Sequence, residues 1–206
     1  MNNIKRIIKY IVFFKFIDSI YNFLLFKRFK IKTPKRLSIN GRVKVLNKGS
    51  IFLGENIRIN SGKNYNTIGG DVRTNIIVAK NSVFSIGNNV GISNSTFFCS
   101  KKIQIEDDVL VGGGCKFYDT DFHALNYKER MNPYKRNMPD REVRSSAILV
   151  KNGAWIGGHS IILKGVTIGS NSIIGAGSVV SKSIPENEIW AGNPVKFIRK
   201  NLEYIS

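Results

Sequence analysis

The sequence contains two histidines, His123 and His159, and His123 has two carboxylates just before it. It ends the run Tyr-Asp-Thr-Asp-Phe-His, which also contains Asp119 and Asp121. An imidazole can take a proton from an attacking hydroxyl near neutral pH, and a nearby carboxylate can fix its tautomer. We therefore predict that His123 is a general base and that Asp121 orients it. Asp119 competes for that role or binds hydroxyl groups of a substrate, and either aspartate could instead be a turn residue.

The segment that carries His123 interrupts a repeat. Aliphatic residues return at every sixth position from Val150 to Val180, and the same spacing appears over residues 86–98 and 105–117. Over residues 118–147 this register stops. Long excursions from a compact domain are usually functional. We predict an extruded active-site loop over 118–147.

A six-residue period fits neither an α-helix nor a β-sandwich, whose strands alternate with period two. It fits a β-solenoid in which three six-residue faces make one coil and equivalent side chains stack about 4.8 Å apart. Glycine and asparagine then serve the corners, because they tolerate a positive φ. His159 follows Gly157 and Gly158 at such a corner, so we expect its side chain to point outward and not to act as the base.

Composition and charge limit the classes of partner. The 206 residues are 42% hydrophobic, and 32 Lys and Arg against 14 Asp and Glu give a net charge of +18. Such a charge implies an anionic partner: nucleic acid, a membrane surface or a charged substrate. No nucleic-acid-binding module is recognisable, so we expect no nucleic acid. Cys99 and Cys115 fit no metal-ligand spacing, and we expect both to be small buried residues in a reducing compartment.

Residues 1–36 carry half of the net charge and are rich in Ile, Phe, Leu and Tyr. We predict a basic, apolar helix or helical hairpin. Lys9, Lys15 and Asp18 interrupt the apolar run, which makes a transmembrane span a poor fit. No small-residue cleavage site follows, as a signal peptide would need. Two readings stay open: a helix lying on an anionic membrane surface, or a helix packed on the body of an oligomer.

The stretch from Trp155 to Lys200, WIGGHSIILKGVTIGSNSIIGAGSVVSKSIPENEIWAGNPVKFIRK, resembles the C-terminal signature of the hexapeptide-repeat acyltransferases. It is most similar to the branch of galactoside, maltose and capsule O-acetyltransferases. The resemblance implies an all-β solenoid, a left-handed parallel β-helix over 37–195, followed by a C-terminal tail over 196–206. It also implies a homotrimer with each active site between two neighbouring β-helices, and acetyl-CoA as the acyl donor with no metal.

The resemblance assigns further site residues. It places Gly158 at the acetyl group, where the developing oxyanion needs a backbone N–H donor. Trp155 could line the acceptor pocket or cap a corner. The residues that it places along the groove for CoA and at the CoA phosphates are Ala176, Ser181, Lys182, Lys196 and Arg199. For Lys196 and Arg199, a solvated basic tail is the alternative.

These observations predict an acetyl-CoA-dependent O-acetyltransferase that acts on a cell-surface polysaccharide, such as capsule or lipopolysaccharide, or on its precursor. The glycan acceptor could be anionic or lipid-linked, and we expect a cytoplasmic enzyme, peripheral on the inner face of the membrane if residues 1–36 contact lipid. The alternatives are N-acetylation of an amino-sugar nucleotide and O-acetylation of a small molecule such as an antibiotic. Serine acetyltransferases carry a long helical N-terminal domain, and γ-class carbonic anhydrases need three histidine zinc ligands, so both fit poorly.

Overall fold

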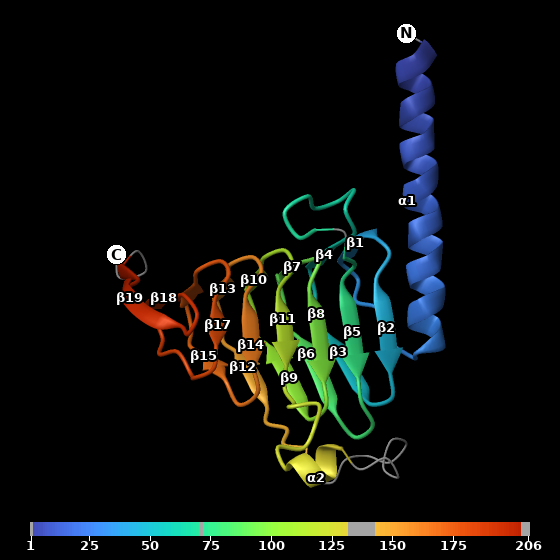
Figure 1. Ribbon diagram of the computed structural model, residues 1–206. Coiled ribbons are helices and arrows are strands. Elements are labelled where there is room, and N and C mark those ends of the chain that lie inside the picture. The colour runs from blue at the N-terminus through green and yellow to red at the C-terminus, as the bar shows by residue number, and fades with distance from the viewer. Residues whose placement is uncertain (1, 71, 132–142, 203–206) are drawn as a thin grey trace.

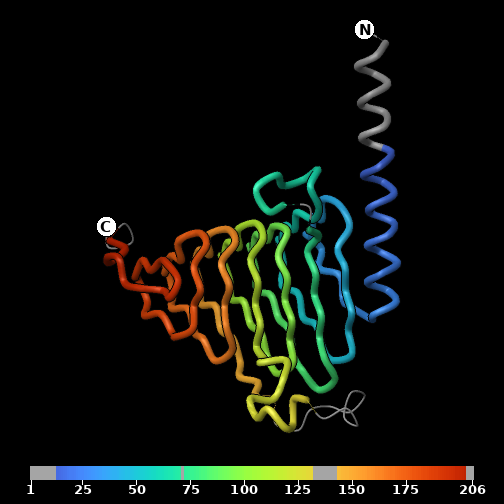
Figure 2. Tube along the Cα trace, viewed as in Figure 1, coloured from blue at the N-terminus to red at the C-terminus, as the bar shows by residue number. Residues whose placement is uncertain are grey.

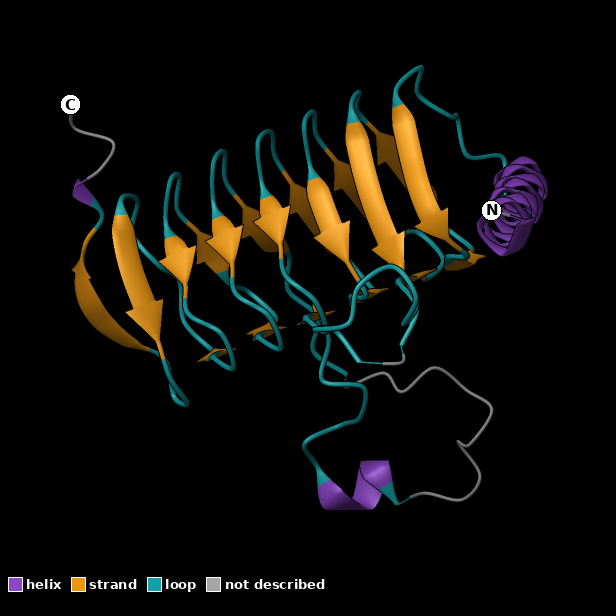
Figure 3. Cartoon of the chain, turned by 90° about the horizontal axis from the view of Figure 1, so that it is seen from above, coloured by secondary structure: helices purple, strands orange, loops and turns teal. Residues whose placement is uncertain are grey.

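The structure is a computed structural model that describes residues 2–70, 72–131 and 143–202, with the backbone alone for residues 2–12. A long helix, α1 (Asn2–Arg28), comes first, and nearly all of the remaining elements are short strands. Successive strands of the chain fall in turn into three parallel sheets, here called A, B and C (Figures 1 and 3).

In spatial order, sheet A contains β1 (Leu37–Gly41), β4 (Ile57–Ser61), β7 (Gly91–Ser93), β10 (Leu110–Val111), β13 (Trp155–Ile156), β16 (Ile173–Ile174), β18 (Glu188–Ala191) and β19 (Lys196–Lys200). Sheet B contains β17 (Val179–Val180), β14 (Ile161–Leu163), β11 (Lys116–Tyr118), β8 (Thr96–Cys99), β5 (Asn75–Val78) and β2 (Lys44–Asn47). Sheet C contains β15 (Thr167–Ile168), β12 (Ile148–Val150), β9 (Lys102–Ile105), β6 (Val83–Ile86) and β3 (Ser50–Leu53).

The predicted six-residue register is confirmed except at Phe98, where the inward residue is its neighbour Phe97. Its inward positions from Val150 to Val180 are all fully buried, and equivalent residues pair across coils, as Val111 does with Ile156 and Ile156 with Ile174. Figure 2 shows the coils lying side by side along one axis. Strands that alternate among three parallel sheets fit the predicted left-handed β-helix.

The second half of α1 packs against the first coil. Asn22 is buried; its side-chain amide donates to the Gly41 carbonyl at 2.8 Å and accepts from the Val43 N–H at 3.2 Å. Phe26 is also buried in the core. This half of the helix therefore packs on the first coil of its own chain, and the choice between a membrane surface and the body of an oligomer stays a prediction. Within the described part of the chain, no helix is both long and apolar enough to cross a bilayer.

The chain leaves the coils twice (Figure 2). Residues 62–74, between β4 and β5, form an excursion at the corner of sheets A and B, and we call it the N-terminal loop. Residues 119–147, between β11 and β12, form the second at the corner of sheets B and C. This histidine loop contains α2 (Tyr127–Arg130), and its residues 132–142 lie outside the described part.

The C-terminal segment differs from the expected tail. Residues 196–200 form β19, which pairs antiparallel with β18, and residues 203–206 lie outside the described part. Six-residue counting could not find this strand, because it turns back on the last coil and leaves the repeat.

Candidate active site

Asp119 anchors the start of the histidine loop. Its carboxylate is fully buried and accepts three backbone N–H groups, from Ser100 at 2.7 Å, Lys101 at 2.7 Å and Lys102 at 2.8 Å. These N–H groups belong to the turn that leaves β8 in the preceding coil. Because both carboxylate oxygens are engaged and shielded from solvent, Asp119 has a structural role here. This corrects the prediction that it binds the substrate.

The base of the histidine loop is closed by the returning chain. The Asp121 N–H donates to the Arg144 carbonyl at 3.1 Å, and Thr120 forms an antiparallel bridge with Ser145. The Ser146 N–H donates to the Asp119 carbonyl at 2.9 Å. The loop therefore leaves and rejoins the β-helix at one point.

The Phe122 side chain packs against two aromatic rings and so fixes the backbone just before His123. Its ring lies edge-on to Phe98, with centroids 4.7 Å apart, and to Tyr118, with centroids 5.2 Å apart. Phe98 and Tyr118 stand side by side on β8 and β11. The φ of Phe122 is 63°, which is an uncommon conformation for a bulky residue and one that occurs preferentially at functional sites.

His123 is exposed and makes no hydrogen bond to any described residue. Its neighbours hold it in place, because Ala124 is 1% exposed and the Arg130 side chain donates to the Ala124 and Leu125 carbonyls at 3.0 and 3.1 Å. A firmly held backbone that presents an unpaired imidazole to solvent suits a general base that meets its substrate from outside.

Asp121 contacts Lys164 instead of His123. Its carboxylate lies 2.7 Å from the Lys164 Nζ, and both side chains are partly exposed. Lys164 follows β14 in the next coil, so Asp119 and Asp121 fasten the loop to the coils on either side of it. The orienting role predicted for Asp121 stays a prediction.

Gly158 and Ala176 lie one above the other at the corner between sheets A and B. The Gly177 N–H donates to the Gly158 carbonyl at 2.9 Å. The N–H of Gly158 has no partner among the described residues and is available as a donor. A Cβ at Gly112 would approach the Gly158 nitrogen to 2.6 Å, so this close stacking requires glycine at position 112.

Ser181 and Lys182 follow β17 at the opposite corner of sheet B, and both are exposed. The Lys182 Nζ lies over the Trp190 ring, 4.9 Å from its centroid, and Trp190 contacts Phe197 of β19. This chain of contacts brings Lys182 toward β19, which carries the exposed Lys196 and Arg199. The structure thus groups these predicted CoA-binding residues at the C-terminal end of the β-helix.

Trp155 lies on another face. It is half-exposed on β13 of sheet A, beside Leu110 of β10, and lines a shallow hollow of about 370 Å³. The loop that carries His123 leaves the β-helix at the corner of sheets B and C. A single chain therefore does not bring Trp155 and His123 together.

Sequence reasoning missed the N-terminal loop and its contact with the second histidine. The His159 ring nitrogen Nε2 lies 2.8 Å from the Ile68 carbonyl oxygen, and the φ of His159 is 61°. Asn94 holds the same loop: it accepts from the Gly62 N–H at 2.8 Å and donates to the Asn66 and Gly70 carbonyls. The signal in the sequence was the loss of register between Ile59 and Val78, together with three glycines.

Cys99 and Cys115 are free and buried, as expected. Burial, reinforced by the nearby Asp119 carboxylate, raises the pKa of the Cys99 thiol to about 12, and burial also raises the pKa of Cys115. Both thiols stay protonated and shielded near neutral pH, so neither suits a nucleophilic role.

Comparison with known proteins shows that the sequence is similar to several acetyltransferases. The family described as bacterial transferase hexapeptide (six repeats) matches residues 147–182. Galactoside O-acetyltransferase of Escherichia coli is 37% identical over 124 residues, which cover 57% of this chain and 57% of that protein. A Saccharomyces cerevisiae protein named as a candidate acetyltransferase is 33% identical over 141 residues, covering 65% of this chain and 67% of that protein.

A solved structure supports the fold. The N-acyltransferase AntD of Bacillus cereus, in complex with dTDP and 3-hydroxybutyryl-CoA, superposes with a TM-score of 0.65 at 22% identity and covers 88% of each chain. At that identity the likeness shows the fold alone. The matches to the first of the curated relatives span little more than half of the length of those proteins.

Proposed function

Because the chain belongs to the hexapeptide-repeat acetyltransferase family, we propose that it transfers an acetyl group from acetyl-CoA to a sugar hydroxyl of a cell-surface polysaccharide or of its precursor. The observation that carries this proposal is the unpaired imidazole of His123 on a firmly held loop. The loop leaves sheet B, whose two corners carry Gly158, Ala176, Ser181 and Lys182, four of the residues that the family resemblance assigns to the acetyl group and CoA.

Gly158 and the loop of His123 lie at opposite corners of sheet B, so the proposed chemistry combines Gly158 of one copy of the chain with His123 of another. His123 takes the proton of the acceptor hydroxyl as its oxygen attacks the thioester carbon. The carbonyl oxygen becomes an oxyanion, which the free N–H of Gly158 stabilises. Collapse of this intermediate breaks the carbon–sulfur bond, and the departing CoA sulfur receives the proton from the imidazolium. Lys196 and Arg199 pair with the CoA phosphates, and Lys182 lies along the CoA groove.

We further propose a left-handed β-helix that assembles as a homotrimer with the active site between two chains. The separation of Trp155 from His123 supports this arrangement, because an acceptor that touches both residues must lie between two copies. Sedimentation equilibrium at several protein concentrations tests it, and a mass that stays that of one chain would contradict it.

The function is tested with the surface glycan of the host, chemically de-O-acetylated and incubated with acetyl-CoA and the protein. We expect the glycan to gain acetyl groups in mass spectrometry and free CoA to appear in equal amount. The matched variant is His123→Ala. A gain that survives this substitution would refute the base, and no gain with either protein would refute the polymer acceptor.

N-acetylation of an amino-sugar nucleotide is the alternative to this proposal. O-acetylation of a small molecule such as an antibiotic is the remaining alternative. An assay with amino-sugar nucleotides separates N-acylation from the first proposal, because an amide resists the mild alkali that removes an O-acetyl ester.

We also propose that the exposed face of α1 lies on the anionic inner surface of the cytoplasmic membrane. Phe13, Phe16 and Phe23 lie on this face, each more than half exposed, and the segment is strongly basic. We expect the protein to sediment with vesicles rich in phosphatidylglycerol and not with phosphatidylcholine alone. If the variant Phe13→Ser/Phe14→Ser/Phe16→Ser sedimented equally well, this proposal would fail.

A further inference from the structure

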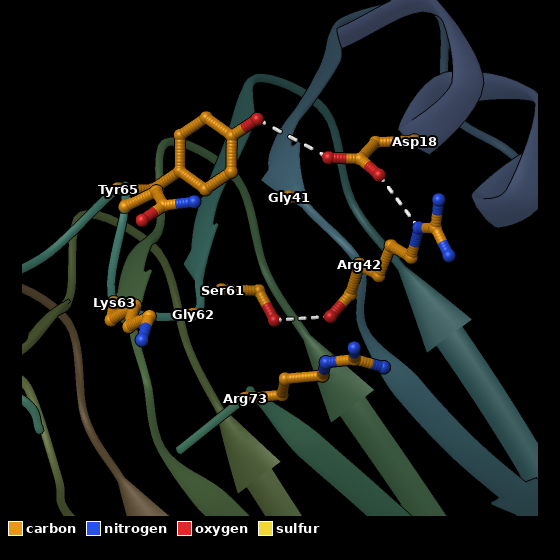
Figure 4. A pocket seen from close by; sticks show the side chains of 9 residues that line it. Asp18, Gly41, Arg42, Ser61, Gly62, Lys63, Tyr65 and Arg73 are labelled. Carbon is orange, nitrogen blue, oxygen red and sulfur yellow. Dashed lines mark hydrogen bonds and ion pairs between the residues drawn. The ribbon is translucent and has the colours of Figure 1, made fainter. Parts of the chain in front are cut away.

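A pocket lies where α1, the first coil and the N-terminal loop meet, far along the β-helix from the C-terminal end. It has a volume of about 330 Å³ and includes three basic side chains, Arg42, Lys63 and Arg73, in its lining (Figure 4). Among the described residues, Asp18 is the one acid that lines it. We call it the junction pocket.

The acid is already neutralised. Asp18 Oδ1 accepts from the Arg42 Nε at 2.6 Å, and Asp18 Oδ2 accepts from the Tyr65 hydroxyl at 3.2 Å (Figure 4). Burial and the neighbouring Asp18 carboxylate raise the pKa of Tyr65, so its hydroxyl stays a donor. Asp18 therefore has little acceptor capacity left for the other two cations.

Arg42 is held ready to bind. Besides its bond to Asp18, its guanidinium lies over the Tyr21 ring at 5.3 Å, and its carbonyl accepts from the Ser61 hydroxyl at 2.5 Å. No described residue accepts a hydrogen bond from its two Nη groups. An arginine fixed in this way loses little conformational entropy when it pairs with a ligand.

Lys63 and Arg73 have no hydrogen bond or ion pair with any described residue. Both are exposed side chains at the two ends of the N-terminal loop, which returns to the same corner. Cations gathered in a concave site repel one another and focus a positive potential, and an anionic ligand relieves that repulsion.

We propose that the junction pocket binds a phosphate or pyrophosphate group. Among the described lining residues, three cations and one anion leave a net charge of +2, which matches a phosphate dianion better than a single carboxylate. A tetrahedral anion also accepts from several donors at once, as the two arginine forks and the lysine offer. The volume leaves room for a pyrophosphate or for part of the group that it carries. The proposal stands apart from acetyl transfer, since it needs neither His123 nor CoA.

The test is calorimetric titration of the full chain with inorganic pyrophosphate in a phosphate-free buffer. We expect saturable binding that the variant Lys63→Gln/Arg73→Gln weakens about tenfold or more. The matched control is Arg36→Gln/Lys80→Gln, which removes the same charges from exposed positions that line none of the described pockets. It should bind like the unchanged protein. Melting curves of all three proteins check that each is folded.

Several outcomes overturn the proposal. The first is no binding at millimolar pyrophosphate. The second is equal weakening of binding in the control variant, which would indicate a diffuse effect of the net charge. The third is tighter binding of galacturonate than of pyrophosphate. Two further ligands identify the source of the phosphate. Tighter binding of uridine diphosphate would indicate a nucleotide, and tighter binding of a short-chain prenyl diphosphate would indicate a lipid carrier. Equal affinities would indicate that the phosphates alone are recognised.

Discussion

The two loops that leave the β-helix differ in how they contact the two histidines. The N-terminal loop lies along the corner of sheets A and B and places the Ile68 carbonyl against the ring of His159, so that one ring nitrogen is engaged. The histidine loop is fastened by its backbone and leaves the ring of His123 without a partner among the residues that the structure describes. A histidine available for chemistry is thus distinguished by a fixed backbone and a free side chain.

The same difference separates the two aspartates before His123. Both carboxylate oxygens of Asp119 accept hydrogen bonds from backbone N–H groups, whereas Asp121 forms a partly exposed ion pair. Asp119 therefore holds the loop in place, whereas Asp121 can exchange its partner. Proximity in sequence therefore says little about which carboxylate serves a catalytic histidine.

The largest expected effect contrasts the histidines. His123→Ala should lower the rate of acetyl transfer about 10²–10⁴-fold, because the general base is lost. The free energy of unfolding should change by no more than about 0.5 kcal/mol, because the side chain is exposed and unbonded. His159→Ala should leave the rate nearly unchanged and lose about 1 kcal/mol of stability with its hydrogen bond. Single-turnover rates and urea unfolding measure both, and a reversed pattern would exchange the roles of the histidines.

The next effect contrasts the aspartates. Asp119→Ala should lower the free energy of unfolding by roughly 3–5 kcal/mol, because three backbone N–H groups lose a buried, charged acceptor. The matched variant Asp121→Ala should cost about 1 kcal/mol or less, as partly exposed ion pairs do. Urea unfolding followed by circular dichroism gives both values. Equal losses would mean that the buried carboxylate contributes no more than the exposed one.

A third effect concerns the fastening of the N-terminal loop. Asn94→Gly removes three hydrogen bonds to this loop, and its φ of 41° suits glycine, so backbone strain is not added. We expect a loss of about 2 kcal/mol and faster hydrogen exchange of amides over residues 62–70, with acetyl transfer unchanged. Faster exchange that spreads to residues 119–131 would show that the two excursions are coupled.

The sequence predicted the parts that depend on counting. The six-residue register identified the inward positions from Val150 to Val180, and its interruption located the histidine loop. The same counting could have placed Trp155 on the outside of sheet A, since it precedes the inward Ile156. The role of Asp119 was beyond reach, because its three donors come from the preceding coil. The bond between His159 and Ile68 also needed the structure, since the two residues are 91 positions apart.

The smallest effect asks how Asp121 acts. If it only fastens the loop, Asp121→Asn and Lys164→Gln remove the same ion pair. Both should then slow acetyl transfer by the same few-fold factor, and the double variant should be no slower than either one. If Asp121 moves to the imidazolium during the reaction, Asp121→Asn alone should shift the pH–rate profile to lower pH, because an imidazolium without its carboxylate partner loses its proton more readily. Pre-steady-state rates of the three variants across pH decide between them. The double-variant cycle is the sharper criterion. Coupling between Asp121 and Lys164 that persists at every pH can arise only if the carboxylate stays with Lys164. Loss of this coupling where His123 is protonated means that Asp121 has changed partners.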